Sequence, residues 1–434
     1  MKIFKAILIL SILPAFMHGQ DIRDKLSPEE KVYGLSKIWA EVNNNFVFLD
    51  KLDFDFDSLY METIPKVLNA KDNLEYISIL RTFMSRLGDG HTGLMQSQDY
   101  WNSGDYPPVF IELVDDKFLV KSISEEYVEM IPLGSELLRA DLIPYVDFKK
   151  VSPSGNLFSY VNSTVLLEFK VPNGDIVEKA FIRNFNHKHR TNNPIKMIEK
   201  EDNQSNTNWS EYKYLEHDGF SVVEINTFES DIVVNKFQED ITRINSTSGL
   251  ILDIRENGGG NSEYSKGVAQ HLVERDFLVG PMWKTRINNG AKKAWGSMAI
   301  FGFEDEWTVS NASFWKNDAW EVNQPDTSYI EPNIQKIDVP IVILTGENTF
   351  SAAEDFLIYT LGNQNITKIG RNSAGSSGQP LLITLPGGIS ARICSKRDAL
   401  PNGDDYIGIG IEPDIKTDRG IDQVEYAISH IKNN

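Results

Sequence analysis

Cysteine is almost missing from this chain of 434 residues, which contains Cys394 and no other. A single cysteine excludes an intrachain disulfide and a metal site built from cysteines. Basic residues are also scarce, since 43 lysines and arginines stand against 62 acidic residues and leave a net charge of −19. This balance argues against binding nucleic-acid phosphates or anionic membrane surfaces by charge neutralisation. The length is enough for two or three domains.

Long hydrophobic runs are missing as well. Residues 1–19 contain Lys2 and Lys5, then the short apolar stretch 6–13, then small residues up to Gly19. This is the shape of an export signal, and the stretch is too short to span a bilayer permanently. No cysteine follows it, which excludes a lipoprotein anchor. We therefore expect a signal peptide and an exported protein, periplasmic or extracellular; the alternative is a buried N-terminal helix.

Helical periodicity follows the expected signal. The stretch Ser27-Pro-Glu-Glu30 is a helix start, with an N-cap serine, a proline at the first helical position and a capping-box acid. Apolar residues recur at helical spacing after it, and again at 57–68 and 74–87. The last stretch ends in a tight glycine-rich turn that leaves His91 near the surface; on this stretch alone, a loop histidine with no role is the alternative. These features predict a small helical bundle over residues 20–103.

Strand patterns come next. Four apolar, β-branched runs flank two turn sequences, 109–114 with 118–123 and 165–171 with 176–182. The second turn is Pro-Asn-Gly-Asp, a strong hairpin signal. We therefore expect a compact, mostly β domain over residues 104–187 and a polar linker at 188–211.

Strands and helices alternate from residue 212 onward, as is typical of a parallel sheet covered by helices. A buried strand at 249–254 runs into the glycine loop Gly258-Gly-Gly260. This loop lacks the Gly-Lys-Ser/Thr signature of a phosphate loop and the spacing of a dinucleotide site. Consecutive glycines also serve where backbone N–H groups must approach a substrate carbonyl. An insertion at 277–336 holds five of the eight tryptophans, which line a binding surface or form a satellite core.

A second strand-to-helix junction lies at Ser351. Residues 341–344 are apolar, a polar turn follows, and the helical pattern starts at Ala352 with Glu354 and Asp355 in its first turn. A serine at such a junction is presented by the turn, beside the free N–H groups of a helix start that can hold an oxyanion. The junction indicates a nucleophile; the alternative is that the serine only caps the helix.

Three motifs, in this order, resemble one family: Leu252-Asp-Ile-Arg-Glu-Asn-Gly-Gly-Gly260, Ser351-Ala-Ala-Glu-Asp-Phe356 after a buried strand, and Gly408-Ile-Gly-Ile-Glu-Pro-Asp414. The chain is similar to the C-terminal processing (tail-specific) proteases and tricorn protease, serine peptidases whose core the interphotoreceptor retinoid-binding proteins share. The resemblance implies an α/β multidomain fold: the helical bundle, a PDZ-like β domain, and a crotonase-like α/β core over residues 212–434.

The resemblance also implies the site. Ser351 is the expected nucleophile, and the backbone N–H groups of Ala352 and Gly259 are the expected oxyanion hole. Processing proteases place a lysine base in the glycine loop after the nucleophile helix, where this chain has Ser376. The tricorn-like branch uses a histidine at the end of the N-terminal helical region, which matches His91. An imidazole can take the serine proton and return it to the leaving amine. No metal and no organic cofactor is expected.

The acid that orients the histidine is matched less well. Tricorn protease uses a second serine and a glutamate, where this chain has Gly90 and Ile407. We expect Asp405 to take the place of the glutamate; Asp89 and Glu354 are the other candidates.

The sequence therefore predicts an exported serine peptidase that hydrolyses peptide bonds of proteins or peptides. Its PDZ-like domain would capture them by the C-terminus or as an extended strand. One alternative is a catalytically impaired member that binds peptides or apolar ligands. Another keeps the enzyme and gives the role of base to Lys368 or Lys396. Neither a nucleic-acid partner nor a membrane span is expected.

Overall fold

The computed structural model describes residues 26–95, 104–114, 117–141, 143–144, 153–185, 196–199, 210–418 and 420–433. The expected signal at 1–19 and most of the expected linker at 188–211 lie outside the described residues. Within the described ranges, every helix is too short or too polar to cross a bilayer.

The N-terminal region is helical, as its periodicity predicts. The capping box at Ser27 is confirmed: its hydroxyl accepts from the N–H of Glu30 at 3.2 Å, and the Glu30 carboxylate accepts from the N–H of Ser27 at 2.8 Å. Pro65 lies inside the second helix. The elements are α1 (Pro28–Asn45), the 3₁₀ turn η1 (Leu49–Lys51), α2 (Phe56–Asn69) and α3 (Asn73–Ser85).

The next region is built from antiparallel strands with a core of its own. Its described strands form a sheet in the order β10-β4-β5-β8-β9, with β3 on β4 and β6 on β5, and a separate pair β2–β7. Both predicted hairpins, β3–β4 and β8–β9, are confirmed. The elements are β2 (Gly104–Asp105), β3 (Val109–Val114), β4 (Lys117–Ser124), β5 (Glu136–Ala140), β6 (Ile143–Pro144), η3 (Pro153–Leu157), β7 (Ser159–Tyr160), β8 (Thr164–Lys170), β9 (Ile176–Ile182) and β10 (Met197–Glu199).

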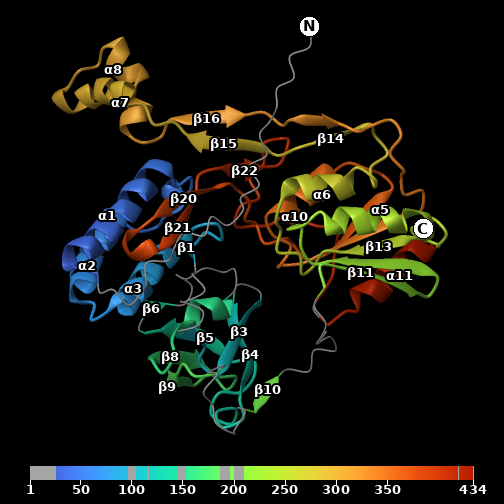
Figure 1. The fold of residues 1–434 in the computed structure, drawn as a ribbon, viewed down its shortest axis with the longest axis horizontal. Coiled ribbons are helices and arrows are strands. Elements are labelled where there is room, and N and C mark those ends of the chain that lie inside the picture. Colours follow the sequence, from blue (N-terminus) through green and yellow to red (C-terminus); the bar gives the residue numbers. More distant parts are fainter. Residues whose placement is uncertain are drawn as a thin grey trace.

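A six-stranded sheet forms the C-terminal part, in the order β11-β12-β13-β18-β19-β23, and all its neighbours are parallel except β11 and β12. Helices α5, α6 and α10 pack on one face and α11 on the other, so strand residues alternate between two apolar layers (Figure 1). The elements are β11 (Tyr212–His217), β12 (Phe220–Ile225), α5 (Ile232–Ile244), β13 (Leu250–Asp253), α6 (Ser262–Ala269), β18 (Ile341–Thr345), α10 (Ala352–Tyr359), β19 (Ile366–Gly370), β23 (Ile415–Lys416) and α11 (Gln423–Asn433).

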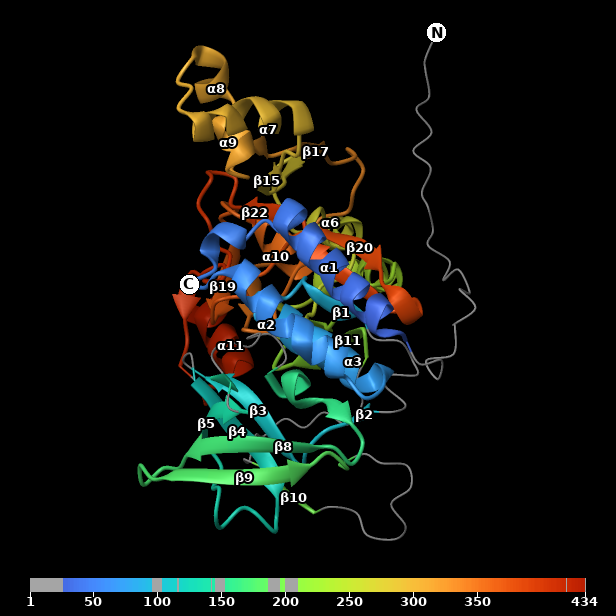
Figure 2. The ribbon, with the colours of Figure 1, turned by 90° about the vertical axis from the view of Figure 1, so that its left-hand side faces the viewer.

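The aromatic-rich insertion forms an arm that projects beyond the rest of the chain, with α7 and α8 at its tip (Figures 1 and 2). Phe301 and Trp307 are 72% and 64% exposed, so the tip is not a closed satellite core. The arm contains β14 (Phe277–Val279), β15 (Met282–Arg286), α7 (Gly290–Ser297), η4 (Met298–Phe301), α8 (Glu306–Ser310), α9 (Ala312–Trp315), β16 (Trp320–Asn323) and β17 (Thr327–Tyr329), and β15 also pairs with β22 (Arg397–Ala399).

A small sheet joins the N-terminal helices to the C-terminal part. Strand β1 (Gly93–Met95), two residues after His91, pairs with β21 (Ser390–Cys394), which pairs with β20 (Pro380–Thr384). One buried apolar core spans both regions and includes Leu35, Ile38, Leu80, Ile389, Ala391 and Ile393. The turn that carries His91 is therefore fixed against the C-terminal part by backbone pairing and by a shared core. The fold is mixed α/β and multidomain; the bundle, PDZ-like and crotonase-like assignments stay predictions.

Candidate active site

Ser351 occupies a strained backbone position between β18 and α10. Its φ of 57° and ψ of −120° lie where residues other than glycine are uncommon. Its N–H donates to the Glu354 carboxylate at 3.1 Å and to the carbonyl oxygen of Ser376 at 3.2 Å. Strain of this kind persists where the surroundings hold it, and it concentrates at functional sites.

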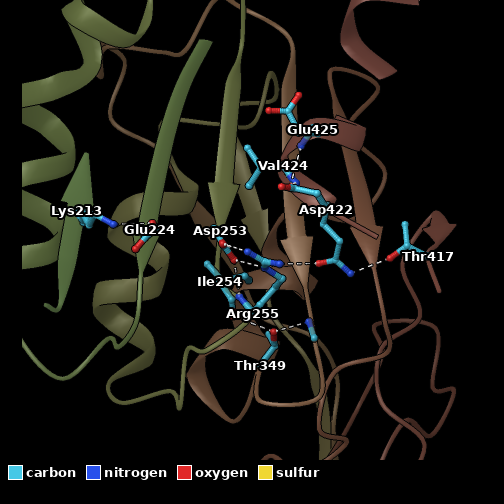
Figure 3. Close-up of polar contacts among 12 residues, drawn as sticks. Lys213, Glu224, Asp253, Ile254, Arg255, Thr349, Thr417, Asp422, Val424 and Glu425 are labelled. Carbon is cyan, nitrogen blue, oxygen red and sulfur yellow. Dashed lines mark hydrogen bonds and ion pairs between the residues drawn. The ribbon is translucent and has the colours of Figure 1, made fainter. Parts of the chain in front are cut away.

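The turn before Ser351 is tied to the end of β13. The hydroxyl of Thr349 donates to the carbonyl of Ile254 at 2.9 Å and accepts from the N–H of Gly346 at 3.0 Å. Figure 3 shows Thr349 beneath the strand end that also holds Asp253 and Arg255, which form an ion pair. The position of the turn is therefore fixed by hydrogen bonds to the end of a strand of the parallel sheet, as well as by contacts within the loop.

His91 lies between two serines. Its Nε2 is 3.0 Å from Ser351 Oγ, and its Nδ1 is 3.2 Å from Ser376 Oγ. The ring stacks on Phe350, with centroids 4.7 Å apart and an interplanar angle of 11°. The expectation of a ring near the surface is wrong, since His91 is 6% exposed. A base within 3.0 Å of a serine hydroxyl is close enough to take its proton.

A buried carboxylate lies behind Ser376. The Ser376 hydroxyl donates to Asp89 Oδ1 at 3.4 Å, and the Thr92 hydroxyl donates to Asp89 Oδ2 at 2.6 Å. When Nε2 accepts a hydrogen bond from the Ser351 hydroxyl, Nδ1 carries the ring proton and donates a hydrogen bond to Ser376 Oγ. The contacts therefore form one directed chain that ends on the Asp89 carboxylate.

The chain departs from the resembled family at Gly90 and at Ser376, and the two departures are linked by their packing. A Cβ at Gly90 would lie 2.8 Å from the Phe350 ring and 3.0 Å from Ser376 Oγ. The space that a serine side chain before the histidine would occupy is thus filled by an aromatic ring and by another serine hydroxyl. Sequence reasoning treated Ser376 only as the place of an absent lysine and missed its contact with His91. The glycine before the histidine was the available signal.

Asp405, the expected orienting acid, is not brought to His91. Its Oδ2 accepts from Lys51 at 2.8 Å and from Arg397, and its Oδ1 accepts from the N–H of Ile407 at 3.0 Å. Burial opposes its ionisation, but the hydrogen bonds from Lys51 and Arg397 outweigh burial and lower its pKa. The expectation is corrected because two nearby cations bind this carboxylate.

The two candidate lysines also have other partners. Lys368 is 4% exposed, its Nζ donates to the Thr360 carbonyl at 3.4 Å, and burial lowers its pKa. Lys396 Nζ lies 2.9 Å from Asp398 Oδ1. Burial acts to lower the pKa of Lys396, but Asp398 outweighs it and the pKa is raised. A lysine whose pKa is raised is a poor base at neutral pH.

Gly259 lies against the nucleophile, but its N–H is already bound. It donates to Asn257 Oδ1 at 2.9 Å, which corrects the expectation that this N–H faces a substrate oxyanion. Among the described residues, no acceptor binds the N–H of Ala352 or that of Gly258. The helix start and the glycine loop thus each contain an N–H group with no acceptor in the described part of the chain, that of Ala352 and that of Gly258.

The close packing at Gly259 predicts a large difference between two alanine variants. A Cβ on Gly259 would lie 2.6 Å from the Phe350 carbonyl and 2.7 Å from Ser351 Cβ, and its φ is 89°. We expect Gly259→Ala to displace Ser351 and to lower kcat at least about 10²-fold. A Cβ on Gly290, at the start of α7 in the arm, meets nothing within 4 Å, so Gly290→Ala is the control, with kcat within about threefold of wild type. Equal kcat values for the two variants would contradict this packing argument.

The C-terminal part of the chain matches a known peptidase family. Residues 219–417 match the family model described as peptidase family S41. The chain therefore contains a domain of peptidase family S41. It is a serine-type peptidase, and its substrates are proteins or peptides. The matched stretch contains Ser351 and Ser376, whereas His91 lies before it.

Solved structures resemble this chain along most of its length. Mature CPAF complexed with lactacystin has a TM-score of 0.59 at 17% identity, covering 94% of this chain and 99% of that one. Mature CPAF alone has a TM-score of 0.56 at 16% identity, with 90% and 92% covered. A putative peptidase from Parabacteroides merdae has a TM-score of 0.50 at 19% identity, with 94% and 97% covered. At these identities the likeness concerns the fold. No curated protein sequence matches the chain.

Proposed function

We propose that this chain is an exported S41 peptidase in which Ser351 is the nucleophile and His91 the general base. The observation that carries the proposal is the 3.0 Å separation between His91 Nε2 and Ser351 Oγ. Nε2 takes the hydroxyl proton as Oγ attacks the scissile carbonyl, and the imidazolium then returns the proton to the leaving amine. Water releases the acyl group by the same steps.

Ser376 and Asp89 orient the base. The Nδ1–H···Oγ contact with Ser376 holds the tautomer in which Nε2 can accept, and the hydroxyl of Ser376 passes the interaction to Asp89. A carboxylate at the end of this chain favours the imidazolium that forms during attack. Because a neutral hydroxyl lies between ring and carboxylate, the stabilisation is weaker than in a direct histidine–carboxylate pair.

The oxyanion hole consists of the N–H groups of Ala352 and Gly258. Ala352 is the first residue of α10, where backbone donors have no helical partner and the helix dipole favours negative charge. Gly258 supplies the second donor from the loop that packs on Ser351. Donors fixed before the reaction stabilise the tetrahedral intermediate without having to reorganise.

The remaining assignments complete the proposal. Residues 1–19 direct export, and residues 104–187 form a PDZ-like domain that captures a peptide C-terminus or an extended strand. Residues 20–103 form the helical bundle that carries His91, and residues 212–434 form a crotonase-like core.

Covalent labelling tests the proposal. A fluorophosphonate probe reacts with a serine whose hydroxyl is activated by a base, so we expect one adduct, on the peptide that contains Ser351. Mass spectrometry of the digested protein identifies the labelled residue, and heat-denatured protein is the control. Labelling at another serine would overturn the assignment. A folded protein that binds peptides and takes no label would favour the binding-protein alternative.

A further inference from the structure

Glu354 has both carboxylate oxygens fully engaged at the base of the candidate site. Its Oε2 accepts from the N–H of Ser351 at 3.1 Å and from the N–H of Ser376 at 3.0 Å. Its Oε1 accepts from the N–H of Gly375 and from the hydroxyl of Ser373, both at 2.7 Å. The side chain is 0% exposed. Four donors around one buried carboxylate is more than helix capping requires.

We propose that Glu354 is a positioning residue which, as a carboxylate, holds Ser351 and Ser376 in the register in which both contact His91. The inference rests on the proposed function. The same oxygen accepts from the backbone of both serines, while their two hydroxyls bind the two nitrogens of the imidazole. One atom thus connects the nucleophile turn to the loop that orients the base.

The donor set selects the ionised form of this side chain. An ionised carboxylate only accepts hydrogen bonds, whereas a carboxylic acid or an amide places a donor on one oxygen position. Two donors face each oxygen of Glu354. In a carboxylic acid or an amide, one of these positions would carry a hydrogen that points at the surrounding N–H or O–H groups. Loss of the charge would therefore loosen Ser351 or Ser376, and a displacement of about 1 Å can lower kcat about 10²-fold.

The charge of Glu354 is sensitive to pH near neutrality. Burial raises its pKa to about 7, and the hydrogen bonds from Ser373, Gly375, Ser376 and Ser351 act in the opposite direction. The carboxylate is present above this pKa and is lost as the pH falls through it.

The other titratable groups around Glu354 do not replace its charge. Tyr406 is buried, and burial raises its pKa far enough to keep the hydroxyl neutral. Asp355 and Asp398 face the same region, burial raises the pKa of both, and Lys396 forms an ion pair with Asp398. His91 is connected to Glu354 through Ser351 and Ser376.

The proposal predicts a steep acid limb in the pH profile. Two groups must be deprotonated for turnover. His91 must be neutral to act as the base, and Glu354 must be ionised to hold Ser351 and Ser376 in place. Both conditions fail as the pH falls, so the slope of log kcat against pH should approach 2 in the wild type. In Glu354→Gln only the histidine ionisation remains, and the slope should fall to 1.

The experiment compares Glu354→Gln with Asp355→Asn, using kcat, KM, the pH profile and the rate of fluorophosphonate labelling. Asp355 is the adjacent buried acid, and it accepts from Ser262 at 2.5 Å rather than from Ser351. For Glu354→Gln we expect kcat about 10²-fold lower at pH 8 with KM within about twofold, labelling slowed in parallel, and the lower slope. Asp355→Asn should keep the wild-type slope. Glu354→Asp, which keeps the charge, should recover part of kcat.

A wild-type slope of 1 overturns the proposal even if Glu354→Gln fails to fold. So does a Glu354→Gln variant with the wild-type slope, or an equal kcat loss in both variants without a change of slope. A double-mutant cycle that combines Glu354→Gln with Ser376→Ala adds a second criterion. If the two residues act through one contact, the loss of log kcat in the double variant should be less than the sum of the two single losses. If the proposed function itself failed, the wild type would neither turn over peptides nor label at Ser351, which is a different result from all of these.

Discussion

Ser351→Ala lowers kcat for peptide hydrolysis by about 10⁴- to 10⁶-fold, to the level left by binding and by the oxyanion donors alone. The variant removes the hydroxyl 3.0 Å from His91 Nε2 and leaves the backbone contacts of the turn in place. KM should change little, because the lost interaction forms only as the bond to the carbonyl forms. The measurement is steady-state hydrolysis of a fluorogenic peptide.

Ser395→Ala is a suitable control. Its hydroxyl donates to the carbonyl of Gln379 at 2.8 Å on the surface, so we expect kcat within about twofold of wild type. If Ser351→Ala cleaved the same peptides at the wild-type rate, the nucleophile would have to be sought elsewhere.

His91→Ala is expected to lower kcat by about 10⁴-fold, because Ser351 would lose the group that takes its proton. Added imidazole should restore part of the rate by diffusing into the space beside Phe350. The restored rate should rise with pH as imidazole loses its proton. The measurement is kcat against imidazole concentration at several pH values, for His91→Ala and for wild type.

Lys396→Gln is the matched comparison, since it keeps a hydrogen-bonding group beside Asp398. We expect it to retain turnover because the Lys396 amine pairs with that acid rather than with Ser351. Activity that survived His91→Ala and vanished in Lys396→Gln would transfer the role of base to the lysine.

Local features of the chain could be predicted because they depend on neighbours in sequence. The capping box at Ser27, the hairpin between β8 and β9, and the strand-to-helix junction at Ser351 each follow from a short run of residues. The ordered motifs also indicated the peptidase family, because together they resemble the motifs of its members. These predictions required no knowledge of which segments lie side by side.

The partners of each polar group could not be predicted in this way. Asp405 was the expected orienting acid, yet it binds Lys51, which lies 354 residues away in sequence. Gly259 was the expected oxyanion donor, yet its N–H binds Asn257. Both errors came from matching positions along the chain, whereas a hydrogen bond depends on the direction of a donor in space.

The sequence by itself therefore determined the class of elements, the order of the loops and the presence of a serine at a strand-to-helix junction. Only the tertiary structure decided that His91, 260 residues before Ser351, lies within 3.0 Å of it. The pairing of β1 with β21 and a core shared between the N-terminal helices and the C-terminal part bring the two together. Spacing along the chain carries no information about such a contact, because it forms only when distant segments pack.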